Sequence, residues 1–171
     1  MKKIYAPWRN KYVSGTAHVE NEKKKKNKNE CPFCNQFSEN NDAKYFIIKR
    51  FNNCALAMNL YPYNAGHLMV IPFEHKGDFQ EFSPEIRNEM TEVINTGIKI
   101  VENTMKPQGF NVGFNTGIAG GGGIPSHFHI HILPRWSGDT NFLSTIGETK
   151  VISSDFNDLY KQFKKEIEKI K

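Results

Sequence analysis

The stretch between residues 126 and 133 carries three of the chain's six histidines, at alternate positions. Apolar residues separate them, so that the run reads His127, Phe128, His129, Ile130 and His131. Successive side chains of a β-strand point to opposite faces of the sheet. A strand would therefore place all three imidazoles on one surface, whereas a helix would spread them around its axis. The Phe and Ile residues also favour a strand, so we predict a strand over 126–133.

An ordinary half-buried strand with a polar outer face would show the same alternation. Three histidines in register, directly after a glycine-rich loop, instead favour a chemical role. The imidazole group titrates near neutral pH, so a row of imidazoles can supply a nucleophile, proton donors or metal ligands.

Four consecutive glycines precede the histidine row, in a loop over 118–125. Without Cβ atoms, the backbone of such a loop can approach a ligand closely, and its N–H groups can converge on an anion. A purely structural glycine loop would cost conformational entropy on folding. We interpret the loop as a phosphate cradle, in which the backbone of Gly121, Gly122 and Gly123 faces the charge of the phosphate.

Apolar alternation and turn residues elsewhere in the chain predict further strands. Together with the histidine strand, the expected strands cover 44–50, 53–59, 67–71, 111–117 and 126–133. Residues 61–66 between two of these strands contain Pro and Gly and are expected to form a loop.

Two helices are expected from apolar stripes at helical spacing. The first follows Ser83 and Pro84, a hydroxyl cap and a proline at the first helical position, and extends to Pro107. The second lies within residues 153–171, where it would pack on the domain or on a partner. The sequence thus predicts an α+β fold, with an antiparallel sheet of about five strands and two main helices.

Composition indicates one globular domain over residues 1–171, because 38% of the residues are hydrophobic and the chain is long enough to bury a core. Aromatic residues near the N-terminus (Tyr5, Trp8 and Tyr12) are expected to anchor that segment. No apolar run is long enough to span a membrane. The N-terminus also lacks the apolar segment of a signal peptide, so a cytoplasmic location is expected.

The net charge of +5 owes much to residues 20–30, which hold five lysines and three glutamates. This segment is also rich in asparagine, a composition typical of a solvated, mobile insertion. No aromatic stacking pattern accompanies the lysines, which disfavours nucleic acid as a partner.

Cys31 and Cys34 form a Cys-x-x-Cys pair, and Cys54 is the third cysteine. The pair is compatible with a redox couple, with two buried thiols, or with half of a zinc site, because structural zinc needs four ligands. Cys54 is expected to be a small buried hydrophobe.

The run from His127 to Leu133 resembles the signature of the histidine-triad (HIT) family of nucleotide hydrolases and transferases. A second block, Asn59 to Pro72, is similar to the family's nucleotide-binding strand pair. The segments 134–142 and 8–12 resemble a microbial subgroup that includes diadenosine tetraphosphate phosphorylases. The resemblance spans roughly residues 4–150 and implies a HIT-like fold that pairs into a homodimer.

The resemblance implies a role for each site residue. His129 would attack an α-phosphate and form a covalent nucleotidyl-histidine, while His131 would contact the phosphate or the leaving group. Asn59 would bind the ribose, Asn115 a phosphate oxygen or the ribose end, and His67 would buttress the triad. The substrate would be an adenine nucleotide, and no organic cofactor is expected.

Zinc is also implied, because some family members bind it through two cysteines, a histidine eight residues after the Gly-His pair, and the first triad histidine. The matching residues are Cys31, Cys34, His75 and His127. Four protein ligands leave no open position, so the zinc would be structural.

Many relatives carry a Gln-Ser or Gln-Thr pair where this chain has Gly123 and Ile124, and Ser126 is a candidate replacement for the missing hydroxyl. This departure favours dinucleoside polyphosphates over phosphoramidates, because a phosphate leaving group needs less protonation. The acceptor would be water or inorganic phosphate. A non-catalytic nucleotide-binding module and a mononuclear metallohydrolase are the alternatives, and Trp136 would stack on a base or lie at a subunit contact.

Overall fold

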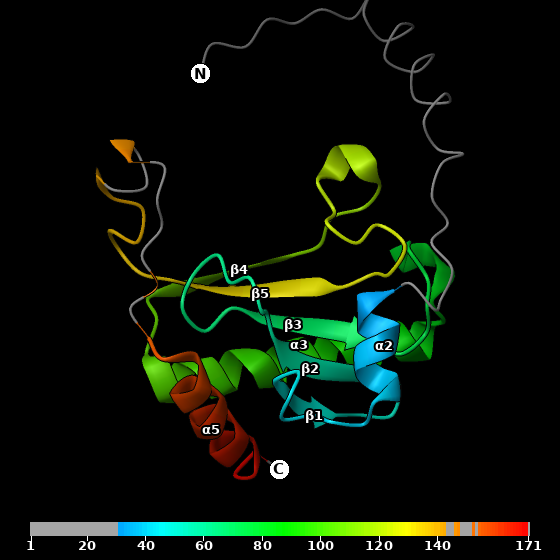
Figure 1. The fold of residues 1–171 in the computed structure, drawn as a ribbon, viewed down its shortest axis with the longest axis horizontal. Helices are drawn as coiled ribbons and strands as arrows, with labels where there is room; N and C mark the ends of the chain where they lie inside the picture. The colour runs from blue at the N-terminus through cyan, green and yellow to red at the C-terminus, as the bar shows by residue number, and fades with distance from the viewer. Residues whose placement is uncertain (1–30, 143–145, 148–151, 153, 171) are drawn as a thin grey trace, which may run out of the picture.

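The computed structural model describes residues 31–142, 146–147, 152 and 154–170. The expected N-terminal aromatic anchors and the charged segment 20–30 lie outside these residues. Five strands form one antiparallel sheet in the order β1-β2-β3-β5-β4 (Figure 1). Their bounds are Ile47–Arg50 (β1), Cys54–Met58 (β2), Leu68–Pro72 (β3), Gly109–Gly113 (β4) and Ile130–Arg135 (β5). The predicted α+β architecture is confirmed.

Helices cover both faces of the sheet. The long helix α3 (Pro84–Met105) and the C-terminal helix α5 (Phe156–Ile167) pack on one face, and the short helix α2 (Pro32–Ser38) packs on the other (Figure 1). Two short 3-10 turns, η3 (Phe79–Glu81) and η4 (Ile118–Gly120), lie in the connections.

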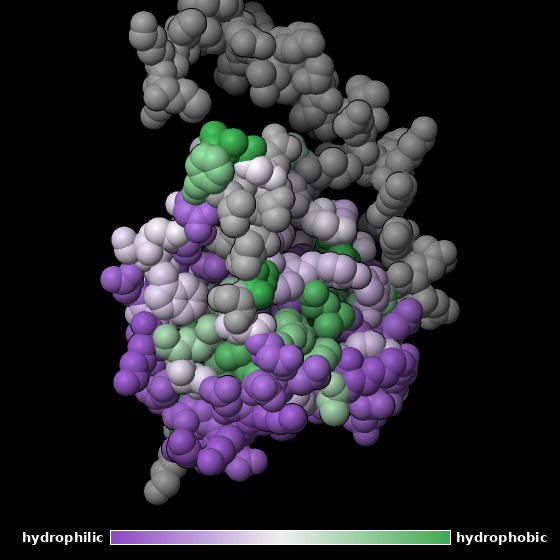
Figure 2. Space-filling view, turned by 60° about the vertical axis from the view of Figure 1, so that its left-hand side comes forward, coloured by the Kyte–Doolittle hydropathy of each residue, from purple (hydrophilic) through white to green (hydrophobic). Residues whose placement is uncertain are grey.

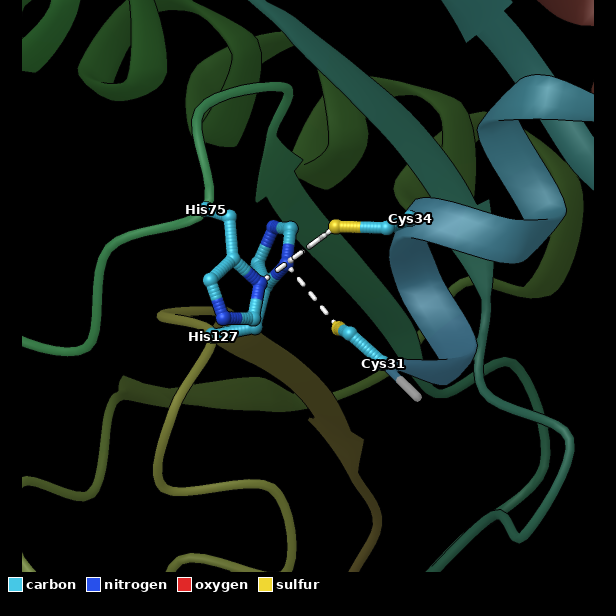
Figure 3. A group of neighbouring side chains, drawn as sticks. All are labelled: Cys31, Cys34, His75 and His127. Carbon is cyan, nitrogen blue, oxygen red and sulfur yellow. Dashed lines mark hydrogen bonds between the residues drawn. The ribbon is translucent and has the colours of Figure 1, made fainter. Parts of the chain in front are cut away.

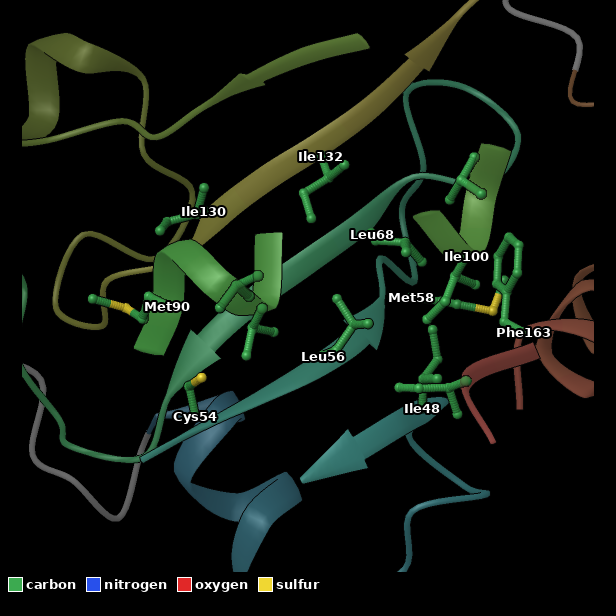
Figure 4. Packing of buried hydrophobic residues seen from close by; sticks show 14 of the residues in the cluster. Ile48, Cys54, Leu56, Met58, Leu68, Met90, Ile100, Ile130, Ile132 and Phe163 are labelled. Carbon is green, nitrogen blue, oxygen red and sulfur yellow. The ribbon is translucent and has the colours of Figure 1, made fainter. Parts of the chain in front are cut away.

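The larger hydrophobic core lies between the sheet and the α3/α5 layer (Figure 4). Ile130, Ile132 and Phe128 contribute to it, as the alternation in the histidine run predicts. Helix α3 approaches the sheet closely at Gly97, where an added Cβ would lie 2.8 Å from Cδ1 of Ile132. The strand that carries the histidines is therefore packed directly against α3.

Both predicted helices form, and the expected cap of the first, Ser83, is present. Ser83 accepts a hydrogen bond from the N–H of Ile86, and Asp155 accepts one from the N–H of Asp158. Helix α5 packs on the domain itself: Tyr160 donates to the carbonyl of Ile47, and Phe163 is completely buried. No helix in the described part of the chain is long and apolar enough to cross a membrane.

Most strand boundaries differ from the prediction by one or two residues, and three differ by more. The strand expected over 126–133 begins only at Ile130, because the N–H of Phe128 donates to the carbonyl of Lys76 in a loop. The strand expected over 111–117 is β4. It ends at Gly113, opposite His131, because its partner β5 begins at Ile130 and does not continue beyond that point. Strand β1 starts at residue 47 rather than 44 because Phe46 has a φ of +53°.

Candidate functional site

The histidines lie on the face of the sheet that α2 covers. His131 pairs with Met69, whose side chain belongs to the hydrophobic cluster on the α2 side of the sheet. Phe33, in the first turn of α2, lies edge-on to the rings of His127 and His129, at 5.4 and 5.2 Å between centroids. The alternation therefore holds, although only His131 lies within the strand.

Four side chains converge beside this row: Cys31, Cys34, His75 and His127 (Figure 3). Their ligand atoms all lie within 4.8 Å of one another. The Nδ1 atom of His127 is 3.3 Å from Sγ of Cys31 and 3.5 Å from Sγ of Cys34, and Nδ1 of His75 is 3.3 Å from Sγ of Cys34. The structure thus joins the four residues predicted as metal ligands into one cluster that could hold a metal ion.

The hydrogen bonding of His127 prepares it for this role. Its Nε2 lies 2.8 Å from the carbonyl oxygen of Pro72, and a carbonyl can only accept, so Nε2 carries the proton. The lone pair of neutral His127 is therefore on Nδ1, the atom that faces the two sulfurs. Burial is the main cause that lowers the pKa of His127 to about 4, which keeps the ring neutral at pH 7.

Helix α2 is the element of this cluster that our sequence analysis missed. Its N-cap is Cys31, its first residue is Pro32, and its first turn carries Cys34. Proline at the first helical position is a helix-start signal. That signal, in the middle of the Cys-x-x-Cys pair, could have indicated the helix and the inward-facing Phe33.

His129 has one ring nitrogen engaged and the other available. Its Nδ1 lies 3.0 Å from the carbonyl oxygen of His127, so Nδ1 donates and the lone pair is on Nε2. Burial lowers the pKa of His129, opposed by the hydrogen bond to His127, and so favours the neutral ring. A neutral, oriented imidazole with a free lone pair is what nucleophilic attack requires.

His67 and His131 form a second hydrogen-bonded pair. The N–H of Tyr63 donates to Nδ1 of His67 at 3.2 Å, so Nε2 of His67 carries the proton. That nitrogen lies 3.0 Å from Nδ1 of His131 and donates to it. In neutral His131 the remaining proton is therefore on Nε2, which makes this ring a hydrogen-bond donor at its other end.

Burial lowers the pKa values of both rings, with the neighbouring histidines adding to the effect. The pKa of His67 falls to about 3 and that of His131 to about 4. The pair is therefore uncharged at pH 7. His67 contacts the triad through this hydrogen bond, and its role as a buttress stays a prediction.

Asn59 lies at the end of β2, against His67. Its Oδ1 accepts from the N–H of Tyr61 at 2.9 Å, and its Nδ2 is 3.3 Å from Nδ1 of His67. The side chain is largely buried, at 9% exposure. Its role against the ribose stays a prediction.

The glycine loop folds back on Asn115. A Cβ added at Gly122 would lie 3.8 Å from Cβ of Asn115, and Gly121 has a φ of +82°, a backbone conformation that favours glycine. Asn115, Gly121 and Gly123 are exposed, and Ser126 is half-buried. Their contacts with a phosphate remain predicted.

Comparisons with known proteins agree with this arrangement. A family model described as the HIT domain matches residues 40–138. AP-4-A phosphorylase of Mycobacterium tuberculosis is 32% identical over 92% of this chain and 80% of its own length. The asymmetrical bis(5'-nucleosyl)-tetraphosphatase of Schizosaccharomyces pombe is 27% identical over 54% of this chain and 50% of its own length.

A solved structure shares the fold. The crystal structure of a Zn-bound histidine triad family protein from Mycobacterium smegmatis matches with a TM-score of 0.69 and 23% identity, covering 84% of this chain and 97% of that chain.

Acidification should destabilise the fold between pH about 6.5 and about 3. Both His67 and His131 have folded-state pKa values below the unfolded value, so the unfolded chain binds protons that the folded chain does not. The free energy of unfolding, measured by urea titration, should therefore fall as the pH decreases through this window. The variant His67→Asn lacks one of the two groups and should show a shallower decline; an equally steep one would contradict this account.

Proposed function

This chain belongs to the HIT domain family, and on that basis we propose that it cleaves dinucleoside polyphosphates at an α-phosphate through a nucleotide covalently bound to His129. One observation carries the proposal: Nδ1 of His129 donates to the carbonyl of His127, which leaves the lone pair on Nε2 of a half-buried ring whose lowered pKa favours the neutral form. The substrate class is supported by the relatives, one named for AP-4-A phosphorolysis and one for tetraphosphate cleavage.

The reaction takes place in two displacements. Nε2 of His129 attacks the α-phosphorus of diadenosine tetraphosphate, the bond from that phosphorus to the bridging oxygen breaks, and ATP leaves. Inorganic phosphate then attacks the AMP bound to His129 and releases ADP, which restores the free imidazole. If water is the acceptor, AMP is released instead. Covalent catalysis divides a difficult displacement into two easier ones.

The other residues of the site stabilise the charge on the phosphate. His131 presents its Nε2–H because its Nδ1 accepts from His67. The backbone N–H groups of Gly121, Gly122 and Gly123 and the side chains of Asn115 and Ser126 supply further donors in this proposal. Asn59 would hold the ribose through the second N–H of its Nδ2, because its Oδ1 accepts from Tyr61 and its Nδ2 faces His67.

Product analysis tests the reaction. Incubation with diadenosine tetraphosphate and inorganic phosphate should give ADP and ATP, whereas hydrolysis gives AMP and ATP. The variant His129→Ala should lose turnover by more than the about 10²–10³-fold that one hydrogen-bond donor contributes, while AMP still binds, as measured by calorimetry. Turnover retained in His129→Ala would defeat the assignment of the nucleophile. Binding of the dinucleotide by the wild-type protein without any turnover would favour a binding module.

We further propose that zinc occupies the cluster of Cys31, Cys34, His75 and His127. The donor set fits, because two sulfurs and two imidazole nitrogens are a common tetrahedral zinc set, with edges of roughly 3.3–3.8 Å for zinc bonds of about 2.0–2.3 Å. The observed separations of 3.3 and 3.5 Å lie in that range. Bound there, the metal would stabilise the fold, since four protein ligands leave no position for a reacting water.

Elemental analysis of the purified protein should therefore find about one zinc per chain. The variant Cys34→Ser should lose the metal and unfold at a lower temperature. Cys54→Ser provides the matched control, because Cys54 is buried on the α3 face of the sheet and bonds to Glu89 rather than to the cluster. Equal zinc content in the two variants would contradict the site.

A homodimer is proposed as well. Strand β4 lies at one edge of the sheet, and Val112 and Phe114 at this edge are more than two-fifths exposed. Figure 2 shows one face, where apolar side chains interrupt an otherwise polar surface. An edge strand with apolar neighbours is suited to pairing with a second copy. Light scattering in solution tests this, and the mass of a single chain would exclude it.

A further inference from the structure

A buried carboxylate lies outside the row of histidines, just after β5. The side chain of Asp139 is only 7% exposed and pairs with Arg135, whose Nε and Nη2 donate to it at 2.6 and 2.9 Å. The N–H of Trp136 also donates to it, at 3.2 Å. A buried charge is costly unless it is paired and hydrogen-bonded, and these contacts fix the carboxylate in one position.

Asn64 connects this carboxylate to the loop between β2 and β3. Its Nδ2 donates to Oδ2 of Asp139 at 2.9 Å and to the carbonyl oxygen of Pro134 at 3.0 Å, and the residue is 7% exposed. The loop and the segment after β5 emerge at the same end of the sheet (Figure 1). The side chain of Asn64 therefore ties together two segments that are 75 residues apart.

The tied loop is the one that surrounds His67. The N–H of Tyr63, the residue before Asn64, donates to Nδ1 of His67 at 3.2 Å. The carbonyl of Asn64 accepts from the N–H of His67 at 3.3 Å. The Nδ2 of Asn59 also faces Nδ1 of His67, at 3.3 Å, but the Tyr63 N–H is the nearer donor, at 3.2 Å, and belongs to the loop that Asn64 ties down. A displacement of Asn64 would thus move one of the two donors that keep the proton of His67 on Nε2.

We propose that Asn64 and Asp139 are positioning residues. They hold the Tyr63 N–H against Nδ1 of His67, and they thereby keep the ring proton of neutral His131 on Nε2. The chain of donors runs from Tyr63 to His67 and from His67 to His131. If His67 changed tautomer, its Nε2 would present a lone pair, and His131 would have to donate from Nδ1. The Nε2 of His131 would then offer a lone pair to the phosphate instead of a proton. This inference rests on the proposed function for its catalytic consequence.

The variant Asn64→Ala tests the proposal in the full-length chain. Loss of a correctly oriented donor should lower kcat for diadenosine tetraphosphate by about a hundredfold, with KM changed much less. Nitrogen-15 NMR of the imidazoles should show His67 and His131 protonated on Nε2 in the wild-type protein, and a mixture of tautomers in the variant.

The matched control is Asn103→Ala. Asn103 also donates an amide N–H to a carboxylate, that of Glu166 at 2.9 Å, but this contact joins α3 to α5 on the far side of the sheet. The control should leave kcat and both tautomers unchanged. Should Asn64→Ala fail to fold, Asp139→Asn, which keeps the size of the side chain and removes the charge, is expected to show the same change of tautomers.

Unchanged tautomers in a folded Asn64→Ala or Asp139→Asn variant would overturn the proposal, whatever happens to the rate. A kcat within about twofold of the wild-type value in either folded variant would also overturn the proposal, because the loss of one donor costs far more. If the wild-type protein does not turn over dinucleoside polyphosphates, the proposed function fails, but the NMR comparison still decides whether these residues position His67.

Discussion

His127 connects the two halves of the site, and the rest of the arrangement depends on its hydrogen bonds. Its Nε2 donates to Pro72, its Nδ1 faces the sulfurs of Cys31 and Cys34, and its carbonyl accepts from Nδ1 of His129. One residue thus presents a potential ligand atom through its side chain and orients the ring of His129 through its backbone. Since second contacts of this kind fix the tautomer of a histidine, the proposed zinc site and the proposed nucleophile share a single support.

The two faces of the sheet carry different kinds of side chain. On the face towards α3 and α5, aliphatic and aromatic side chains form the larger core, which includes Phe128 and Ile132. On the face towards α2, the smaller cluster leaves room for polar rings, and burial lowers the pKa values of four of them, His67, His127, His129 and His131. Histidines can be buried here because each has a hydrogen-bond partner, which removes the main cost of placing polar groups in an apolar interior.

Local patterns predicted most of the fold. The alternation around His129 identified the side of the strand that faces the core, and Ser83 marked the start of α3, because both signals depend on neighbours in sequence. The late start of β5 was not predictable, since it results from a hydrogen bond to Lys76 across a loop. The contact between Asn64 and Asp139 was missed for the same reason: neither residue carries a local pattern, and only the folded chain brings them together.

The close approach of α3 at Gly97 has a consequence for the opposite face. Ile132, whose Cδ1 fills the space above this glycine, is the immediate neighbour of His131 in β5. Close-packed interiors transmit small displacements. The distance between α3 and the sheet therefore affects the position of β5 and of the His131 ring. A methyl group added to α3 at position 97 would thus press on Ile132 and shift His131 on the opposite face, so the absent side chain at this position helps to set where the histidines lie.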